Sequence, residues 1–436
     1  MSLWALCAVA VLLFAWSVLS ARFERFDVTG PILFVVVGMV VGNSPFPQLH
    51  VTAETAAIHE LAEITLVLVL FADASRVDPQ DLRRHAGLPI RLLAIGLPLT
   101  IAAGFGLAAA LLTDLPWQLA ALLGAALAPT DAALSAAVVS DQALPARIRR
   151  SLNLESGLND GIATPVVTGL IAASTVLLGR GEFLEPMAAP GWTALRDLMA
   201  GAGIGVAIGY LGSRAIRSAA ARAWTMPGGR RVATLMLAVL PFIVARELDV
   251  NYFVAAFVAG LAFRAGQRDD DPASVELPEL LGQVLSLTVW YVFGAVLLVD
   301  GVREVGWRIA VYAVLSLTVV RMVPVAVSLI GSGTTRRAGV FLGWFGPRGL
   351  ASVIFGLLIV EELPIDDPAV VSVVSAIALT VVLSVVLHGV SGRPMTAWLT
   401  CAEGSASPAG AGEAENEDPT TIVPRHPFGL RHRLHH

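Results

Sequence analysis

Apolar runs of bilayer-crossing length recur along the chain from Ser2 to about Gly392, separated by short polar loops. Hydrocarbon satisfies no backbone hydrogen bond, so a chain crosses it as helices or as a closed barrel. The two-residue alternation of a barrel strand is missing. The pattern therefore predicts an all-α polytopic membrane protein with about 13 transmembrane helices. They are expected at about 2–21, 28–42, 61–75, 89–112, 116–140, 152–179, 195–217, 232–247, 250–263, 278–299, 307–330, 338–360 and 369–392.

Composition agrees with a chain whose main solvent is lipid. Hydrophobic residues make up 56% of the 436 positions and charged residues only 14%, which a soluble domain could not reach without large exposed apolar patches. The formal net charge is −5 and every basic residue is Arg, so nucleic-acid binding has no support. Cys7 and Cys401 are too few for a thiol metal site and too far apart along the chain to suggest a disulfide.

Arginines indicate the orientation, because cytoplasmic loops carry an excess of basic residues. Of the arginines beside the spans, roughly eighteen fall on one side and roughly five on the other. This bias predicts an N-terminus outside the cell membrane and a cytoplasmic C-terminus. Residues 1–400 would form the transmembrane domain. Residues 401–436, rich in Ser, Ala, Gly, Pro and Glu and then in Arg and His, are expected to be a disordered cytoplasmic tail.

The fifth span is interrupted by Ala128-Pro129-Thr130-Asp131. Pro129 removes a backbone hydrogen bond and clashes with the preceding turn, so the helix should break and free carbonyl oxygens beside the Asp131 carboxylate. Hard cations prefer oxygen ligands of this kind. The alternative is a simple proline kink in which Asp131 is a buried hydrogen-bond partner.

The sixth span carries two adjacent polar stripes. Glu155 and Asn159 lie one helical turn apart on one stripe, and Ser156 and Asp160 on the next. Asp160 and Asp131 are both near the middle of their spans, so they could face one cavity. When two carboxylates lie close together in a buried site, the pKa of one of them is raised. That carboxylate can take up a proton when a cation leaves.

Two arginines, Arg321 and Arg348, lie within predicted transmembrane spans. Arg321 needs a buried anion, for which Glu155 is the natural candidate. Arg348 follows Gly346 and Pro347, a second helix-breaking sequence. Breaks in corresponding spans of the two halves predict two inverted repeats, at about 1–179 and 232–392, whose paired discontinuous helices cross at the ion site. Asp131 and Arg348 could balance the half-helix charges there.

The sequence leaves the role of Asp73, near the inner end of the third span, undecided. It could be a cation ligand, part of an entry funnel, or an ordinary juxtamembrane Asp that pairs with Arg76.

Several motifs together give the chain a family resemblance over about residues 22–392. It resembles the electroneutral Na⁺/H⁺ antiporters of the CPA1 (NhaP/NHE) family. The residues that carry the resemblance are Ala128-Pro129-Thr130-Asp131, Glu155-Ser156-x-x-Asn159-Asp160, Arg321-x-x-Pro324 and Gly346-Pro347-Arg348-Gly349.

The resemblance implies roles for these residues. Asp160 would bind cation and proton alternately, and Thr130, Asp131 and Ser156 would complete the Na⁺ site. Asn159 would stand where electrogenic relatives have a second aspartate. The family also implies a homodimer, with a six-helix core moving against a dimerisation domain. Where many members have Phe-Glu-Gly-Gly, this chain has Phe71-Ala72-Asp73-Ala74, so Asp73 is either a substitute ligand or its neighbour.

The expected function is therefore exchange of a monovalent cation, Na⁺ or also Li⁺, for H⁺, without a cofactor and without enzymatic chemistry. A K⁺/H⁺ antiporter of the same fold is the closest alternative. A cation channel could use the same carboxylates but has no need of paired discontinuous helices. An intramembrane aspartyl protease would need a Gly-x-Gly-Asp sequence, which is absent.

Overall fold

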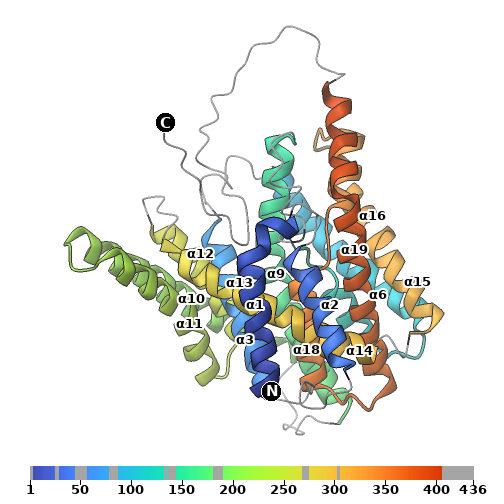
Figure 1. The fold of residues 1–436 in the computed structure, drawn as a ribbon, viewed down its shortest axis with the longest axis horizontal. Helices are drawn as coiled ribbons and strands as arrows, with labels where there is room; N and C mark the ends of the chain where they lie inside the picture. Colours follow the sequence, from blue (N-terminus) through green and yellow to red (C-terminus); the bar gives the residue numbers. More distant parts are fainter. Residues whose placement is uncertain are drawn as a thin grey trace.

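The structure is a computed structural model, and it describes residues 3–24, 29–44, 56–77, 87–131, 134, 144–179, 190–267, 274–301 and 305–404. The described part is a bundle of helices (Figure 1). Within the described residues, eight helical stretches are long and apolar enough to cross a membrane, and three shorter ones are also apolar.

Among the described residues, the first half of the chain contains seven α-helices and one π-helical turn. They are α1 (Leu3–Glu24), α2 (Gly30–Gly42), α3 (Ala56–Ser75), α5 (Gly87–Arg91), η2 (Leu92–Gly96), α6 (Leu97–Leu111), α7 (Trp117–Ala126) and α9 (Ala146–Leu177). α5, η2 and α6 follow one another without a gap, so the predicted fourth span is a single run with one π turn inside it.

The second half continues with a similar set. It comprises α10 (Pro190–Ala221), α11 (Pro227–Glu247), α12 (Tyr252–Gly266), α13 (Glu276–Val292), η4 (Phe293–Leu297), α14 (Leu298–Gly301), α15 (Trp307–Leu317), α16 (Val319–Ser328), α17 (Arg336–Trp344), α18 (Leu350–Glu362) and α19 (Pro368–Gly404). All predicted spans contain helix, which confirms the all-α membrane fold class. The count of 13 and the two inverted repeats stay predictions.

Both predicted breaks fall where the chain leaves the helical conformation. α7 ends at Ala126 and no helix covers 127–131, while α17 and α18 are separated by 345–349. The continuation of the fifth span beyond the first break lies outside the described residues.

The structure differs from the predicted spans in two places. The eleventh span is interrupted at Thr318 (φ −108°, ψ −86°), between α15 and α16. Pro324 lies inside α16, six residues beyond the interruption, and does not account for it. The thirteenth helix does not end near Gly392 but continues as α19 to Gly404, so the first residues of the predicted tail are helical.

A stripe of glycines fixes the packing of α10 on α12. A Cβ at Gly201, Gly205 or Gly209 would lie 2.4, 2.4 and 2.3 Å from backbone oxygens of the facing helix, those of Asn251, Ala255 and Ala259. No side chain fits there without moving a backbone. These glycines therefore serve close helix packing, as their four-residue spacing predicts.

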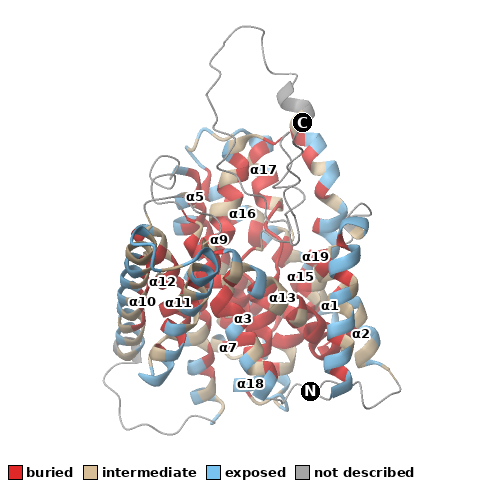
Figure 2. Ribbon diagram, turned by 60° about the vertical axis from the view of Figure 1, so that its left-hand side comes forward, coloured by how far each residue is buried: buried red, intermediate tan, exposed pale blue. Residues whose placement is uncertain are grey.

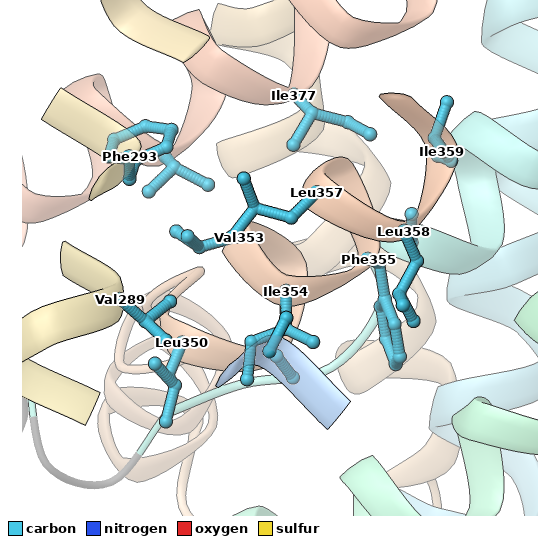
Figure 3. Packing of buried hydrophobic residues seen from close by; sticks show 14 of the residues in the cluster. Val289, Phe293, Leu350, Val353, Ile354, Phe355, Leu357, Leu358, Ile359 and Ile377 are labelled. Carbon is cyan, nitrogen blue, oxygen red and sulfur yellow. The ribbon is translucent and has the colours of Figure 1, made fainter. Parts of the chain in front are cut away.

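α18 lies at the centre of the bundle. Every residue from Leu350 to Ile359 is buried, and buried positions gather in the middle of the molecule while α1 and α10 are largely exposed (Figure 2). Val353 and Leu357 face Phe293 of η4 and Ile377 of α19 (Figure 3). This packing holds the helix that begins at the second break and so fixes the position of that break.

Candidate ion-binding site

The two breaks are hydrogen-bonded to each other. The backbone N–H of Asp131 donates to the carbonyl oxygen of Pro347 at 2.8 Å, and the backbone N–H of Leu350 donates to Asp131 Oδ2 at 3.0 Å. Leu350 is the first residue of α18, so the Asp131 carboxylate accepts from one of the unpaired N–H groups at that helix N-terminus. The residue at the first break thus caps the helix after the second.

Arg348 makes the reciprocal contact. Its side chain is fully buried, and Nη1 donates to the carbonyl oxygens of Ala128 at 2.9 Å and Pro129 at 3.4 Å. These carbonyls follow the C-terminus of α7, where the helix dipole favours a cation. Asp131 and Arg348 therefore take the balancing positions expected from the sequence.

Glycine is required beside Asp131 and beside Arg321 for reasons of space. A Cβ on Gly349 would lie 2.2 Å from Asp131 Oδ2, and one on Gly346 would lie 2.4 Å from Arg321 Nε. Neither residue has a positive φ. The two glycines allow Asp131 and Arg321 to lie directly against the backbone of the break.

Thr130 joins the first break to α9. Its hydroxyl lies 3.2 Å from Ser156 Oγ, and it accepts a hydrogen bond from Asn159 Nδ2 at 2.7 Å. Asp160 follows Asn159 on α9 and is 9% exposed. Two hydroxyls, an amide and a carboxylate thus lie on neighbouring positions of α9 and the break, a set of oxygen donors that suits a small hard cation.

Glu155 and Arg321 form a buried ion pair. Arg321 Nη1 lies 2.6 Å from Glu155 Oε1, and the two side chains are 2% and 3% exposed. This is the pairing expected from the sequence. Because Arg321 also lies against Gly346, it connects α9 with the second break.

Asp73 is half-buried near the end of α3. The nearby Arg76 forms an ion pair with Glu279 of α13. Arg76 therefore has a carboxylate partner other than Asp73.

Two serines of this site were not predicted from the sequence. Ser352 Oγ donates to the carbonyl oxygen of Ala126, the last residue of α7, at 2.7 Å. Ser384 Oγ of α19 accepts from the backbone N–H of Arg348 at 2.7 Å. A lone Ser in an apolar span often bonds its own helix, so the sequence gives no signal that these two reach the breaks.

Comparison with known proteins agrees with this geometry. The family model described as "Sodium/hydrogen exchanger, transmembrane" matches residues 9–398. The chain belongs to this family of sodium/hydrogen exchangers. Such proteins are membrane transporters.

Two relatives of this exchanger are named as antiporters of different cations. A Na⁺/H⁺ antiporter of Schizosaccharomyces pombe is 26% identical over 78% of the chain and 77% of its own length. A K⁺/H⁺ antiporter, NhaP2 of Shewanella baltica, is 30% identical over 38% of the chain and 28% of its own length.

The fold also matches a solved exchanger structure. The sodium proton antiporter MjNhaP1 of Methanocaldococcus jannaschii superimposes with a TM-score of 0.73 at 19% identity, covering 91% of this chain and 98% of the other. At this identity the match shows the fold alone, which is that of the antiporter.

Proposed function

We propose that this exchanger moves Na⁺ in one direction and H⁺ in the other, by alternating access to one site at the crossing of the two breaks. The observation that carries the proposal is the position of Asp160, a nearly buried carboxylate beside the Thr130, Ser156 and Asn159 network. A carboxylate there can hold a cation or a proton, and burial disfavours its being charged without either.

The cation would be bound by Asp160, Thr130 and Ser156, with Asp131 shaping the site from the break. Asp131 already accepts the N–H of Leu350, so its second role is to hold the N-terminus of α18. Glu155 and Arg321 neutralise each other and support the site without binding the cation. Pro129 and Pro347 keep the two breaks open.

One charge at the site changes during the cycle. Asn159 does not ionise, and Arg321 and Glu155 are committed to each other. Arg348 is bound to backbone carbonyls of the first break. This supports an electroneutral exchange of one cation for one proton at Asp160.

The cellular setting follows the sequence expectations. The exchanger would act as a homodimer in the cell membrane, surrounded by lipid, with the N-terminus outside and the C-terminus in the cytoplasm. There it would serve Na⁺ and pH homeostasis.

K⁺/H⁺ exchange is the second candidate, because oxygen ligands bind both cations and one relative is named a K⁺/H⁺ antiporter. The test is purified protein in proteoliposomes with an internal pH dye, challenged with outward or inward gradients of Na⁺, Li⁺ and K⁺. Proton movement driven by Na⁺ or Li⁺ but not K⁺ supports the proposal. Movement driven by K⁺ alone would replace it with the second candidate, and cation flux that needs no counter-moving proton would indicate a channel.

A further inference from the structure

α12 packs against α10 and α3 with backbone directly against backbone. The glycine stripe of α10 leaves no room for a side chain in the first contact. In the second, a Cβ at Gly260 would lie 2.5 Å from the carbonyl oxygen of Phe71 of α3. Helices that meet this closely interlock and resist sliding past one another. α3, α10 and α12 therefore form one rigid unit.

The contact of α12 with α9 is made by side chains instead. Near the start of α12, Asn251 Nδ2 donates to Thr168 Oγ1 of α9 at 3.2 Å. About two turns earlier along α9, a Cβ at Gly161 would lie 2.3 Å from Cδ2 and 2.5 Å from Cγ of Phe257. The Phe257 ring thus occupies the space that a side chain at Gly161 would need. Cγ is the ring atom nearest the backbone, so a turn of the ring about its own axis would not relieve the clash.

Gly161 belongs to a weakened turn of α9. It directly follows Asp160 in the chain. Pro165 lies inside the helix and has no N–H to donate to the Gly161 carbonyl, four residues earlier. Glycine adds backbone freedom at the same point. α9 is therefore easier to bend just past the carboxylate of the candidate site, and Phe257 of the rigid unit lies over that turn.

The surroundings of this contact are apolar. Phe257 is 8% exposed and Asp160 is 9% exposed. Phe257 belongs to the same hydrophobic cluster as Leu158 of α9 and Phe253 of α12. A hydrated cation or a proton reaches a buried carboxylate along a path of water, and an apolar constriction blocks such a path by excluding the water. The ring of Phe257 is placed to form a constriction of this kind beside Asp160.

We propose that Phe257 is a positioning residue that closes the ion site, because its ring over Gly161 keeps the Asp160 carboxylate from being open to both sides of the membrane at once. A site open to both sides would let protons run down their gradient with no cation in return. The proposal rests on the proposed function and adds to it the side chain that prevents this leak.

Proton leak is the most direct test. Sealed proteoliposomes with an internal pH dye are given a pH gradient in buffers that contain choline and a permeant anion but no Na⁺, Li⁺ or K⁺. Wild type should leak little more than empty liposomes. Phe257→Ala should dissipate the gradient several-fold faster, because the path to Asp160 is open. Phe257→Ala combined with Asp160→Asn should return to the wild-type rate, because the carboxylate that relays the proton is gone.

Matched variants separate closure from packing. Phe263→Ala removes another buried ring of α12, one that packs on Phe71, and it should lower Tm in detergent without a proton leak. Phe257→Leu takes the place of Phe257→Ala if that variant fails to fold, and it should still leak faster than wild type. An equal leak through Phe263→Ala, or a leak that survives Asp160→Asn, would show that the variants only loosen the bundle and would overturn the proposal.

Exchange rates test the contact from the side of α9. Gly161→Ala should lose most Na⁺-driven exchange, because its methyl group displaces the ring. Adding Phe257→Leu to Gly161→Ala should recover part of the loss, because the smaller side chain makes room. Gly169→Ala in the same helix is the control, since its Cβ would have no neighbour within 4 Å, and it should exchange at the wild-type rate. No recovery in the double variant would contradict the pairing of Phe257 with Gly161.

The closure and the proposed function can fail separately. Wild type that exchanges Na⁺ for H⁺, together with a Phe257→Ala variant that holds the pH gradient as well as wild type, would overturn the closure alone. Wild type that exchanges no cation, together with a Phe257→Ala leak that depends on Asp160, would refute the proposed function and leave the closure standing.

Discussion

Asp131 and Leu350 lie 219 positions apart in the chain, and the carboxylate of the first accepts the backbone N–H of the second at 3.0 Å. This contact makes the two broken helices one structural unit, because the loop that ends α7 caps the N-terminus of α18. A displacement of either break should therefore displace the other.

The first prediction separates the capping role of Asp131 from its charge. Asn caps helices about as well as Asp, whereas Ala forfeits the hydrogen bond at a cost of about 1 kcal/mol. Asp131→Asn should therefore unfold at nearly the wild-type temperature and still exchange poorly, because the site has lost a negative charge. Asp131→Ala should be less stable than either. Full exchange by Asp131→Asn would show that the charge has no part in transport.

The second prediction concerns the space beside that carboxylate. A Cβ at Gly349 would lie 2.2 Å from Asp131 Oδ2, and overpacking of this kind costs about 1–3 kcal/mol. Gly349→Ala should lose most exchange activity and some stability. Gly343→Ala is the control, because its Cβ would meet Met322 at an ordinary 3.5 Å. Equal effects of the two substitutions on exchange would contradict this account of the break.

The positions of the breaks could be predicted from the sequence because proline and glycine act locally. Pro129, and Gly346 with Pro347, interrupt their helices whatever surrounds them. The pairing of Glu155 with Arg321 could also be anticipated, since few buried charges were available in the spans to satisfy each other.

Contacts that depend on how the helices pack could not be predicted in this way. Nothing in the sequence says that Asp131 Oδ2 meets the N–H of Leu350, or that Ser384 of α19 reaches Arg348. The interruption at Thr318 could not be predicted either, because the nearest proline, Pro324, lies six residues beyond it and inside α16.

The third prediction tests the ion pair as a structural element. Removing one partner of a buried pair strands the other at a cost of about 3–5 kcal/mol. Glu155→Gln and Arg321→Gln should each lower Tm in detergent, and the double variant should recover part of the loss through an amide–amide hydrogen bond. A double-mutant cycle on Tm values should show non-additivity, the signature of direct contact. Losses that simply add would mean that the 2.6 Å contact contributes nothing.

The fourth prediction concerns coupling. In the proposed mechanism only Asp160 changes its charge during the cycle, so exchange should be one for one and indifferent to membrane potential. Proteoliposomes with the potential set by a K⁺ ionophore should show the same Na⁺-driven proton flux at zero and at imposed potentials. Uptake driven by potential alone would require a second titrating group. If K⁺ proves to be a substrate, a lipophilic ion must set the potential instead.

The central claim is that the Asp160 carboxylate carries both ions, and Asp160→Asn tests it most directly. The substitution keeps the shape of the side chain and removes its ability to take up a proton or to charge-balance a cation. Na⁺-driven proton flux is measured in proteoliposomes that contain equal amounts of wild type or variant, with Tm in detergent as the check on folding. The account predicts a folded variant whose flux equals that of empty liposomes, and wild-type flux through Asp160→Asn would contradict it.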